Sequence, residues 1–190
     1  MLFDHNADNK RTGTGWVASD DGLLVLDRNG NGTIDTGREL FGENTLKTNG
    51  EFATDGFDAL ADLDSNNDGK VDASDTEFAN LQVWRDLNQD GISQSNELFS
   101  LDELNIQSIN TAAEHIIEDA GNGNQSIAKG NFTFADGTTG NAASLDFGVN
   151  TFRREFTDTA EISETIQALP AIRCHHKVSG LVFCHLSVTI

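Results

Sequence analysis

A short acidic loop recurs along this chain, and its repetition constrains the fold more than any other feature. DRNGNGTIDTGRE (27–39), DSNNDGKVDASD (64–75) and DLNQDGISQSNE (86–97) each place Asp or Asn at the first, third and fifth places and glycine at the sixth. One such stretch can be an ordinary solvated turn, because Asp and Asn tolerate tight turns and bond their own backbone. Its recurrence favours loops that wrap a hard cation with oxygen ligands from alternate places.

The spacing predicts calcium, which takes six to eight oxygens, whereas magnesium needs a tighter octahedron and zinc prefers nitrogen and sulfur. Side-chain oxygens and a backbone carbonyl at the seventh place supply the candidate ligands. They are Asp27, Asn29, Asn31, Thr33, Asp35 and Glu39 in the first loop; Asp64, Asn66, Asp68, Lys70, Asp72 and Asp75 in the second; and Asp86, Asn88, Asp90, Ile92 and Glu97 in the third.

Three details depart from a regular EF-hand loop. Glu39 falls one place later than the usual twelfth, and Lys70 brings a cation into the second loop. The apolar Ile92 occupies the seventh place instead of the eighth, which predicts an altered register. A fourth stretch, with Asp4, Asn6 and Asp8 at alternate places, has Asn9 instead of glycine and no distal carboxylate, so its metal binding is left open.

The charge balance explains why cations matter to this chain. It carries 12 Lys and Arg against 31 Asp and Glu, a net charge of -19, and only 37% hydrophobic residues. Such a chain repels itself, so we expect it to be largely disordered until calcium binds. Phosphate would meet the wrong sign of charge, which excludes nucleic acid as a partner. No apolar run approaches the roughly 20 residues that span a bilayer, and the polar start is not a signal peptide.

Hydrophobic spacing predicts an α+β fold, with EF-hand-like calcium loops and short helices between an N-terminal hairpin and a C-terminal antiparallel β meander. Helical patterns run into the loop at Asp64 and again over 76–85, which would be about 15 Å long and join two loops. The hairpin is expected over 16–26 and the meander over 106–149. Trp16 and Trp84 lie at core-like positions, and His5 and His115 are isolated.

Longer strings give a more specific signal than the loops. FDHNADNKRTGTGWVASDDGLLVLDRNGNGTIDTGRELFGENT, LDSNNDG, LQVWRDLNQDGISQSNEL and LDELNIQSI resemble the self-processing module of FrpC-like RTX proteins, over most of residues 2–150. The resemblance implies a module that folds on calcium binding, cleaves an Asp-Pro bond at its N-terminal edge and joins the freed Asp carbonyl to a lysine amine. In such chemistry a carboxylate attacks its own main-chain carbonyl and the Pro nitrogen leaves.

The chain departs from that pattern at the decisive place. Its single proline, Pro170, follows Leu169, so it contains no Asp-Pro bond. Relative to the resembling family, Met1 falls inside the module, after the cleavage site. We therefore expect inactivity in cis, assign no catalytic residue and leave enzyme activity open.

Three segments are expected. They are a module over 1–150, a helical connector over 151–170 and a tail over 171–190 whose basic, Cys- and His-containing composition resembles out-of-frame translation. A zinc site from Cys174, His175 or His176, Cys184 and His185 is the alternative for that tail, although its spacing matches no common zinc finger.

Two further functions remain as alternatives. One is a purely structural calcium-binding spacer or adhesion module, and the other is cleavage in trans when the missing segment is supplied. Lysine-bearing proteins would be partners in the second, with Lys10, Lys47, Lys70 and Lys129 as acceptors within the chain. The resemblance implies secretion or a cell-surface location, with the cytoplasm as the alternative for a product that lacks the export signal.

Overall fold

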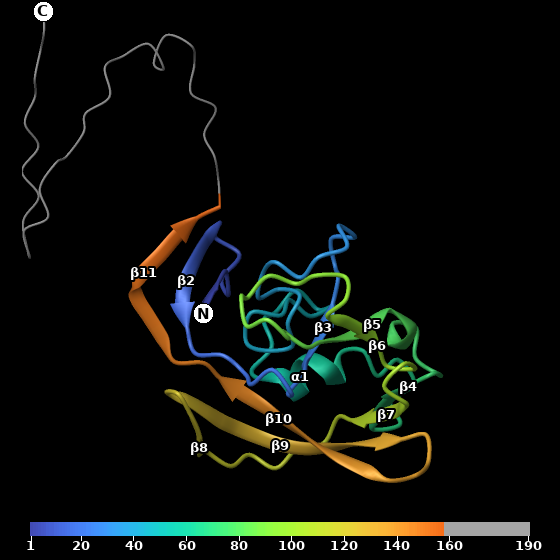
Figure 1. Cartoon of the computed structure of the whole chain (residues 1–190). Coiled ribbons are helices and arrows are strands. Elements are labelled where there is room, and N and C mark those ends of the chain that lie inside the picture. The colour runs from blue at the N-terminus through green and yellow to red at the C-terminus, as the bar shows by residue number, and fades with distance from the viewer. Residues whose placement is uncertain (158–190) are drawn as a thin grey trace, which may run out of the picture. The chain divides into compact units, whose positions relative to one another are not determined.

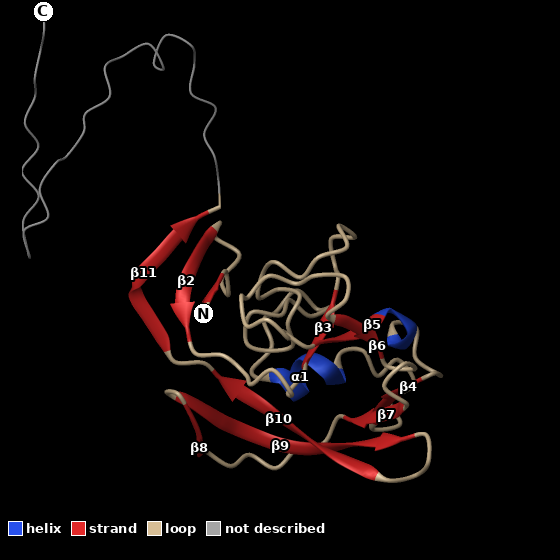
Figure 2. Cartoon of the chain, in the orientation of Figure 1, coloured by secondary structure: helices blue, strands red, loops and turns tan. Residues whose placement is uncertain are grey.

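Eleven short strands, one α-helix and one turn of 3-10 helix make up residues 1–157, the part of the chain that the computed structural model describes (Figure 1). Long loops connect these elements, and strands outnumber helices throughout the described part (Figure 2). The prediction of an α+β fold is therefore wrong, because the protein is β-rich. The short helical patterns fail because isolated helices below about 12 residues are marginal and strand pairing competes with them.

The largest sheet has five antiparallel strands in the order β10-β9-β7-β4, with β8 also paired to β9. Its strands are β4 (Lys70–Asp72), β7 (Ile106–Asn110), β8 (Glu118–Gly121), β9 (Asn124–Phe134) and β10 (Thr139–Asp146). These include the strands that the sequence predicts between residues 106 and 149. Because β4 forms the seventh to ninth places of the second acidic loop and pairs with β7, the sheet holds that loop in place.

A second sheet has the order β3-β5-β6. Strand β3 ends just before the first loop, and β5 and β6 lie on either side of the third. Its strands are β3 (Leu23–Leu26), β5 (Leu81–Trp84) and β6 (Leu98–Ser100). The helix predicted over 76–85 is wrong: it is a 3-10 turn, η1 (Phe78–Asn80), followed by β5. The hairpin predicted over 16–26 is also wrong, because β3 pairs with β5, far along the chain. Burial of Leu81 and Trp84 between neighbouring strands outweighs their helical spacing.

The third sheet joins the two ends of the described part, in the order β1-β2-β11 (Figure 1). Its strands are β1 (Leu2–Phe3), β2 (Lys10–Thr14) and β11 (Val149–Phe156). The helical connector predicted over 151–170 thus begins as strand, because β11 pairs with β2 through Phe156. The rest of that connector, and the tail over 171–190 with its alternative zinc site, lie outside the described residues.

The single α-helix of the described part, α1 (Gly56–Ala61), leads into the loop at Asp64. The Asp55 side chain caps it by accepting hydrogen bonds from the backbone N–H groups of Phe57 and Asp58. Phe57 and Leu60 then face the larger core cluster. No α-helix leaves that loop, which is followed by the 3-10 turn η1, and no α-helix flanks the other two, so the predicted EF-hand-like helices are absent from residues 1–157.

Two hydrophobic clusters support the loops. The larger lies between α1, η1 and the five-stranded sheet, and its members include Leu60, Val71, Leu81 and Ile109. The smaller contains Trp16 and Trp84, whose rings meet edge to face with centroids 5.3 Å apart. Both tryptophans are buried, as their spacing predicts. The smaller cluster also includes Ile34, which places the first acidic loop directly against this core.

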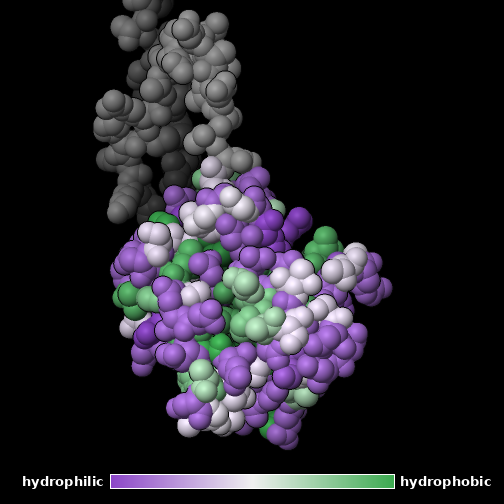
Figure 3. Space-filling view, turned by 90° about the vertical axis from the view of Figure 1, so that its right-hand side faces the viewer, coloured by the Kyte–Doolittle hydropathy of each residue, from purple (hydrophilic) through white to green (hydrophobic). Residues whose placement is uncertain are grey.

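The surface is mostly polar. Figure 3 shows hydrophilic residues over most of one face, with small separate apolar patches between them. The strongly exposed apolar side chains among the described residues include Phe152, Ile117, Phe156 and Val149. No helix within residues 1–157 is long and apolar enough to cross a membrane.

Candidate metal-binding loops

The three acidic loops have the same backbone conformation. In each loop the fourth and sixth residues are left-handed, with φ between 58° and 88°. These residues are Gly30 and Gly32, Asn67 and Gly69, and Gln89 and Gly91. A left-handed residue is costly unless it is Gly or Asn, and here the pattern repeats at equal spacing. The sequence motif therefore specifies one local structure in three places.

The first Asp of each loop fixes this structure by accepting backbone N–H groups. Asp64 accepts from Asp68 N at 3.1 Å and from Gly69 N at 2.9 Å. Asp86 makes the same pair of bonds, to the fifth and sixth N–H groups of its own loop, at 3.1 and 2.9 Å. Asp27 accepts from the sixth N–H at 2.8 Å. Each loop is therefore curled around the carboxylate at its first place.

The last carboxylate of each loop is buried and closes it. Glu39 is 2% exposed, Asp75 5% and Glu97 1%. Each of the three accepts a hydrogen bond from the backbone N–H of the ninth place, which is Asp35, Asp72 or Gln94. Glu39 thus reaches the same position in space as the other two, although it lies one residue later in the sequence. The one-residue offset of Glu39 therefore does not prevent its hydrogen bond to the N–H of the ninth place.

Burial of a closing carboxylate without a counter-charge is costly, and Glu39 shows this cost. At Asp75, burial raises the pKa, but hydrogen bonds from Asp72 and Ser65 outweigh it and the pKa is lowered. Burial raises the pKa of Glu39, and the backbone N–H groups of Asp35 and Thr36 only partly oppose the rise. A bound cation would favour the ionised form and reverse this effect. The donor set, of carboxylates, amides and backbone carbonyls, consists of the oxygens that calcium prefers.

The seventh-place side chains differ among the three loops: Ile92 is exposed, Thr33 donates to Asn31, and Lys70 pairs with Asp72. Thr33 and Ile92 are exposed and Lys70 is half-buried, and the backbone carbonyl of each is the ligand expected at the seventh place. The carboxylates of each loop are not crowded together. Within residues 1–157, no three Asp, Glu, His or Cys side chains form a preformed metal cluster. Binding would therefore draw the carboxylates inward from their present backbone partners.

Comparison with known proteins identifies the type of module. The SPM domain model matches residues 1–148, which contain all three loops. The chain belongs to the SPM domain family. This confirms the resemblance to the self-processing module of FrpC-like RTX proteins.

A similar protein is the iron-regulated protein FrpA of Neisseria meningitidis serogroup C, 50% identical over 162 residues. That match covers 85% of this chain but 14% of FrpA. The SPM domain thus corresponds to a small part of a much longer relative. Strand β11 begins at Val149, just beyond the residues that the domain model matches.

Two loops of this SPM domain are joined through their eighth places. The Ser93 hydroxyl accepts the backbone N–H of Ile34 at 2.7 Å and donates to the Ile34 carbonyl at 3.2 Å. Ile34 and Ser93 are both buried. The first loop is therefore coupled to the third, and the predicted coupling of the second and third loops through a shared helix is wrong.

The contact through Ser93 was not predicted from the sequence. The altered register predicted from Ile92 is wrong, because Ile92 is 45% exposed and Ser93, at the eighth place, is buried. The signal was present in the spacing, because Ile34 and Ser93 both occupy the eighth place, where paired loops can meet. A residue with a hydroxyl at the eighth place can bond the backbone N–H and carbonyl of the facing loop through its side chain.

We expect Ser93→Ala to destabilise the domain by about 1–3 kcal/mol, because it leaves the buried Ile34 N–H without a partner. Chemical denaturation in saturating calcium would measure the loss. Ser95→Ala, at an exposed position in the same loop, is the matched control and should change stability by less than about 0.5 kcal/mol. Equal effects of the two substitutions would refute the coupling.

Lys70 gives the second loop an internal counter-ion. Its Nζ lies 2.5 Å from Asp72 and 3.8 Å from Asp68, and the hydrogen bond from Lys70 lowers the pKa of Asp72 to about 2. A calcium ion in this loop would compete with that ammonium for Asp68. The net negative charge that the second loop presents to a cation is therefore smaller than its four carboxylates alone would give.

The half loop at the N-terminus shares the local structure of the complete loops. Ala7 and Asn9, its fourth and sixth places, have φ values of 53° and 62°. Asp4 accepts the N–H groups of Asp8 and Asn9, as the first Asp of the other loops does. Lys10 pairs with Asp8 at 3.1 Å. The half loop thus retains the curled backbone without a closing carboxylate from its own sequence.

Proposed function

We propose that this SPM domain binds calcium through the loops that begin at Asp27, Asp64 and Asp86, and that the bound ions stabilise its fold. The observation that carries the proposal is the burial of a closing carboxylate in each loop, at the same hydrogen-bonding position. Buried carboxylates need a compensating charge, and few lysines or arginines are available in a chain of net charge -19.

Calcium suits these loops better than other common cations. The ligands are oxygens from flexible loops, which calcium accepts at variable number and distance, whereas magnesium demands near-ideal octahedral geometry. Zinc would favour nitrogen or sulfur, and His5 and His115 both lie outside the three loops. Extracellular calcium, at millimolar concentration, would fill loops of modest affinity. This favours a secreted or cell-surface location for the domain.

The closing carboxylate offers the most direct test. Glu97→Gln keeps the shape of the side chain but removes its charge, so we expect calcium affinity at the third loop to fall by about tenfold or more. Isothermal titration calorimetry would measure it. Glu103→Gln, at an exposed glutamate outside the loops, is the matched control and should leave affinity unchanged. Identical titrations for the two variants would contradict the assignment.

For the self-processing reaction, we propose that this chain supplies the calcium-ordered fold and not the scissile bond. Residues 1–190 contain no Asp-Pro sequence, so that bond has to be supplied from outside them. A peptide that carries an Asp-Pro bond, incubated with the domain in calcium and in chelator, tests activity in trans by mass spectrometry. Calcium-dependent cleavage supports it, and an intact peptide favours the structural spacer.

The lysines named as isopeptide acceptors are all ion-paired in the described part of the domain. Lys10, Lys47, Lys70 and Lys129 lie 2.5–3.1 Å from an Asp or Glu oxygen. The hydrogen bond to Asp58 raises the pKa of Lys47, and that to Asp72 raises the pKa of Lys70. A nucleophilic amine must first lose its proton, so these pairings make the lysines poor acceptors.

A further inference from the structure

Four Asn-Gly pairs occur in this chain, at 29–30, 31–32, 49–50 and 122–123. Asn followed by Gly is the dipeptide most prone to deamidation, because the glycine nitrogen can approach the Asn side chain without steric hindrance. The reaction needs a free glycine N–H and an Asn side chain that can rotate toward it. The four pairs differ sharply in both respects.

Three of the pairs are held by hydrogen bonds on every group that the reaction uses. The N–H groups of Gly30 and Gly32 donate to Asp27, and that of Gly50 donates to the Lys47 carbonyl at 2.9 Å. Each Asn side chain of these pairs donates its amide N–H to a carboxylate and accepts a backbone N–H on its oxygen. The carboxylates are those of Glu39 for Asn29, Asp35 for Asn31 and Glu51 for Asn49.

The fourth pair is free of these restraints. Asn122 and Gly123 form the two-residue turn between β8 and β9, with φ values of 54° and 80°, as in a type I′ turn. Both residues are exposed. Within residues 1–157, neither the Gly123 N–H nor the Asn122 side chain makes a hydrogen bond. The turn can therefore reach the reactive geometry by a local motion, without unfolding of a loop.

We propose that Asn122 is a selective deamidation site of this domain. The Gly123 nitrogen loses its proton to hydroxide and bonds to Cγ of Asn122. The Cγ–Nδ2 bond then breaks as water protonates Nδ2, and ammonia leaves. The resulting succinimide ring then takes up water at one of its two carbonyls, and the ring C–N bond at that carbonyl breaks. The products carry aspartate or isoaspartate at position 122.

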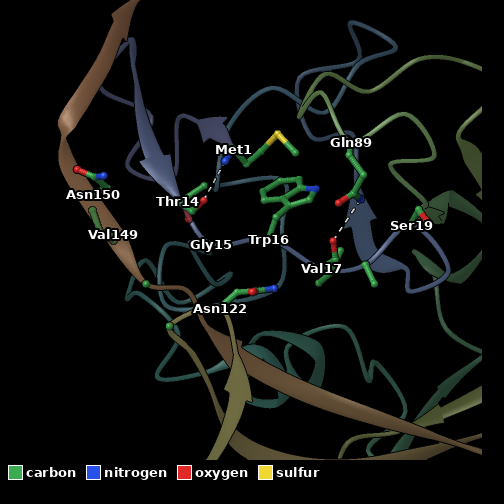
Figure 4. A pocket seen from close by; sticks show the side chains of 13 residues that line it. Met1, Thr14, Gly15, Trp16, Val17, Ser19, Gln89, Asn122, Val149 and Asn150 are labelled. Atoms are coloured by element: carbon green, nitrogen blue, oxygen red, sulfur yellow. Dashed lines mark hydrogen bonds between the residues drawn. The ribbon is translucent and has the colours of Figure 1, made fainter.

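The modification would change two features of the structure. Asn122 lines an open cleft of about 910 Å³ together with Trp16, Gln89 and Asn150, so the reaction adds a negative charge to its wall (Figure 4). Isoaspartate also inserts one extra main-chain carbon into the two-residue turn. Because loop length fixes the register of a hairpin, this insertion disturbs the pairing of β8 with β9.

Incubation of the folded chain at mildly alkaline pH, in calcium, followed by peptide mapping with mass spectrometry, tests the proposal. We expect the mass gain of deamidation at Asn122 to appear at least about tenfold faster than at Asn29, Asn31 or Asn49, because those three must first open locally. The same incubation in denaturant should bring all four rates together. Equal rates in the folded chain, or a faster reaction at another pair, would overturn the proposal.

Asn122→Gln is the control variant. Glutamine closes the corresponding ring far more slowly, and Gln89 already shows that glutamine is accepted at a φ of 59° in this domain. We expect this variant to lose the early mass gain and the isoaspartate signal detected by an isoaspartyl methyltransferase. Persistence of either signal in the variant would place the reactive site elsewhere and refute the assignment.

Discussion

In excess chelator, the chain is expected to lose its native far-UV circular dichroism spectrum and the dispersion of its amide NMR signals, and to regain both when calcium is added. Glu39, Asp86 and Glu97 are each no more than 2% exposed, so without cations they leave buried negative charge in a chain that already carries -19. At a calcium concentration about 100 times Kd, each site adds about 2.7 kcal/mol to stability, which is a large part of a typical domain total.

Magnesium at the same concentration is the control for general charge screening and should restore little of the spectrum. Two substitutions separate loop binding from other effects. Asp90→Ala removes the fifth-place carboxylate of the third loop and should shift the folding transition to higher calcium concentration. His115→Ala, at an exposed histidine, should leave the transition unchanged. A native-like spectrum in chelator would contradict calcium-dependent folding.

The acidic loops were predictable because their structure is local. The side chain at the first place bonds N–H groups four and five residues later, so six residues contain the information. The strand pairing was not predictable in this way. Leu23 pairs with Trp84, and Ser93 meets Ile34 across 59 residues. Such contacts depend on which buried faces fit together, and short apolar repeats do not distinguish a strand from a helix.

The reciprocal contact between Ser100 and Glu103 illustrates the same limit. The spacing S-x-x-E is that of a capping box, and both of its hydrogen bonds form, at 2.8 and 3.2 Å. A turn over 101–105 follows, and not a helix. The side chains satisfy backbone N–H groups locally, whereas continuation into a helix depends on the packing of later residues, and these join β7. Local motifs therefore predicted the turns correctly, but they did not predict which helices and strands follow the turns.

Acidification is expected to destabilise the calcium-saturated domain through His5. This side chain lies in an aromatic cluster, with ring centroids 5.0 Å from Phe3 and 5.6 Å from Phe147, and its Nε2 lies 3.1 Å from the Thr14 hydroxyl. Burial lowers the pKa of His5 from 6.5 to about 4, although the nearby Asp4 carboxylate opposes the shift. The folded state therefore holds His5 neutral where the unfolded state binds a proton.

Because the folded pKa is the lower one, this contribution is complete above pH 6.5 and is lost as the pH falls toward 4. A shift of this size corresponds to about 3 kcal/mol, measurable by chemical denaturation across that range. His5→Phe keeps an aromatic ring without a titrating group, so its stability should change less over the same window. His115→Gln should follow the parent chain, because His115 is 73% exposed on its side chain.

The difference between parent and variant isolates His5 from two other acid effects. Asp72 has a pKa of about 2 in the folded state, so its loss of stabilisation begins below its ordinary value near 4, under the His5 window. Protonation of loop carboxylates, which releases calcium, affects parent and His5→Phe alike. An unchanged pH slope between 6.5 and 4 in His5→Phe would show that the imidazole is protonated in the folded domain, and that the aromatic cluster opens to water.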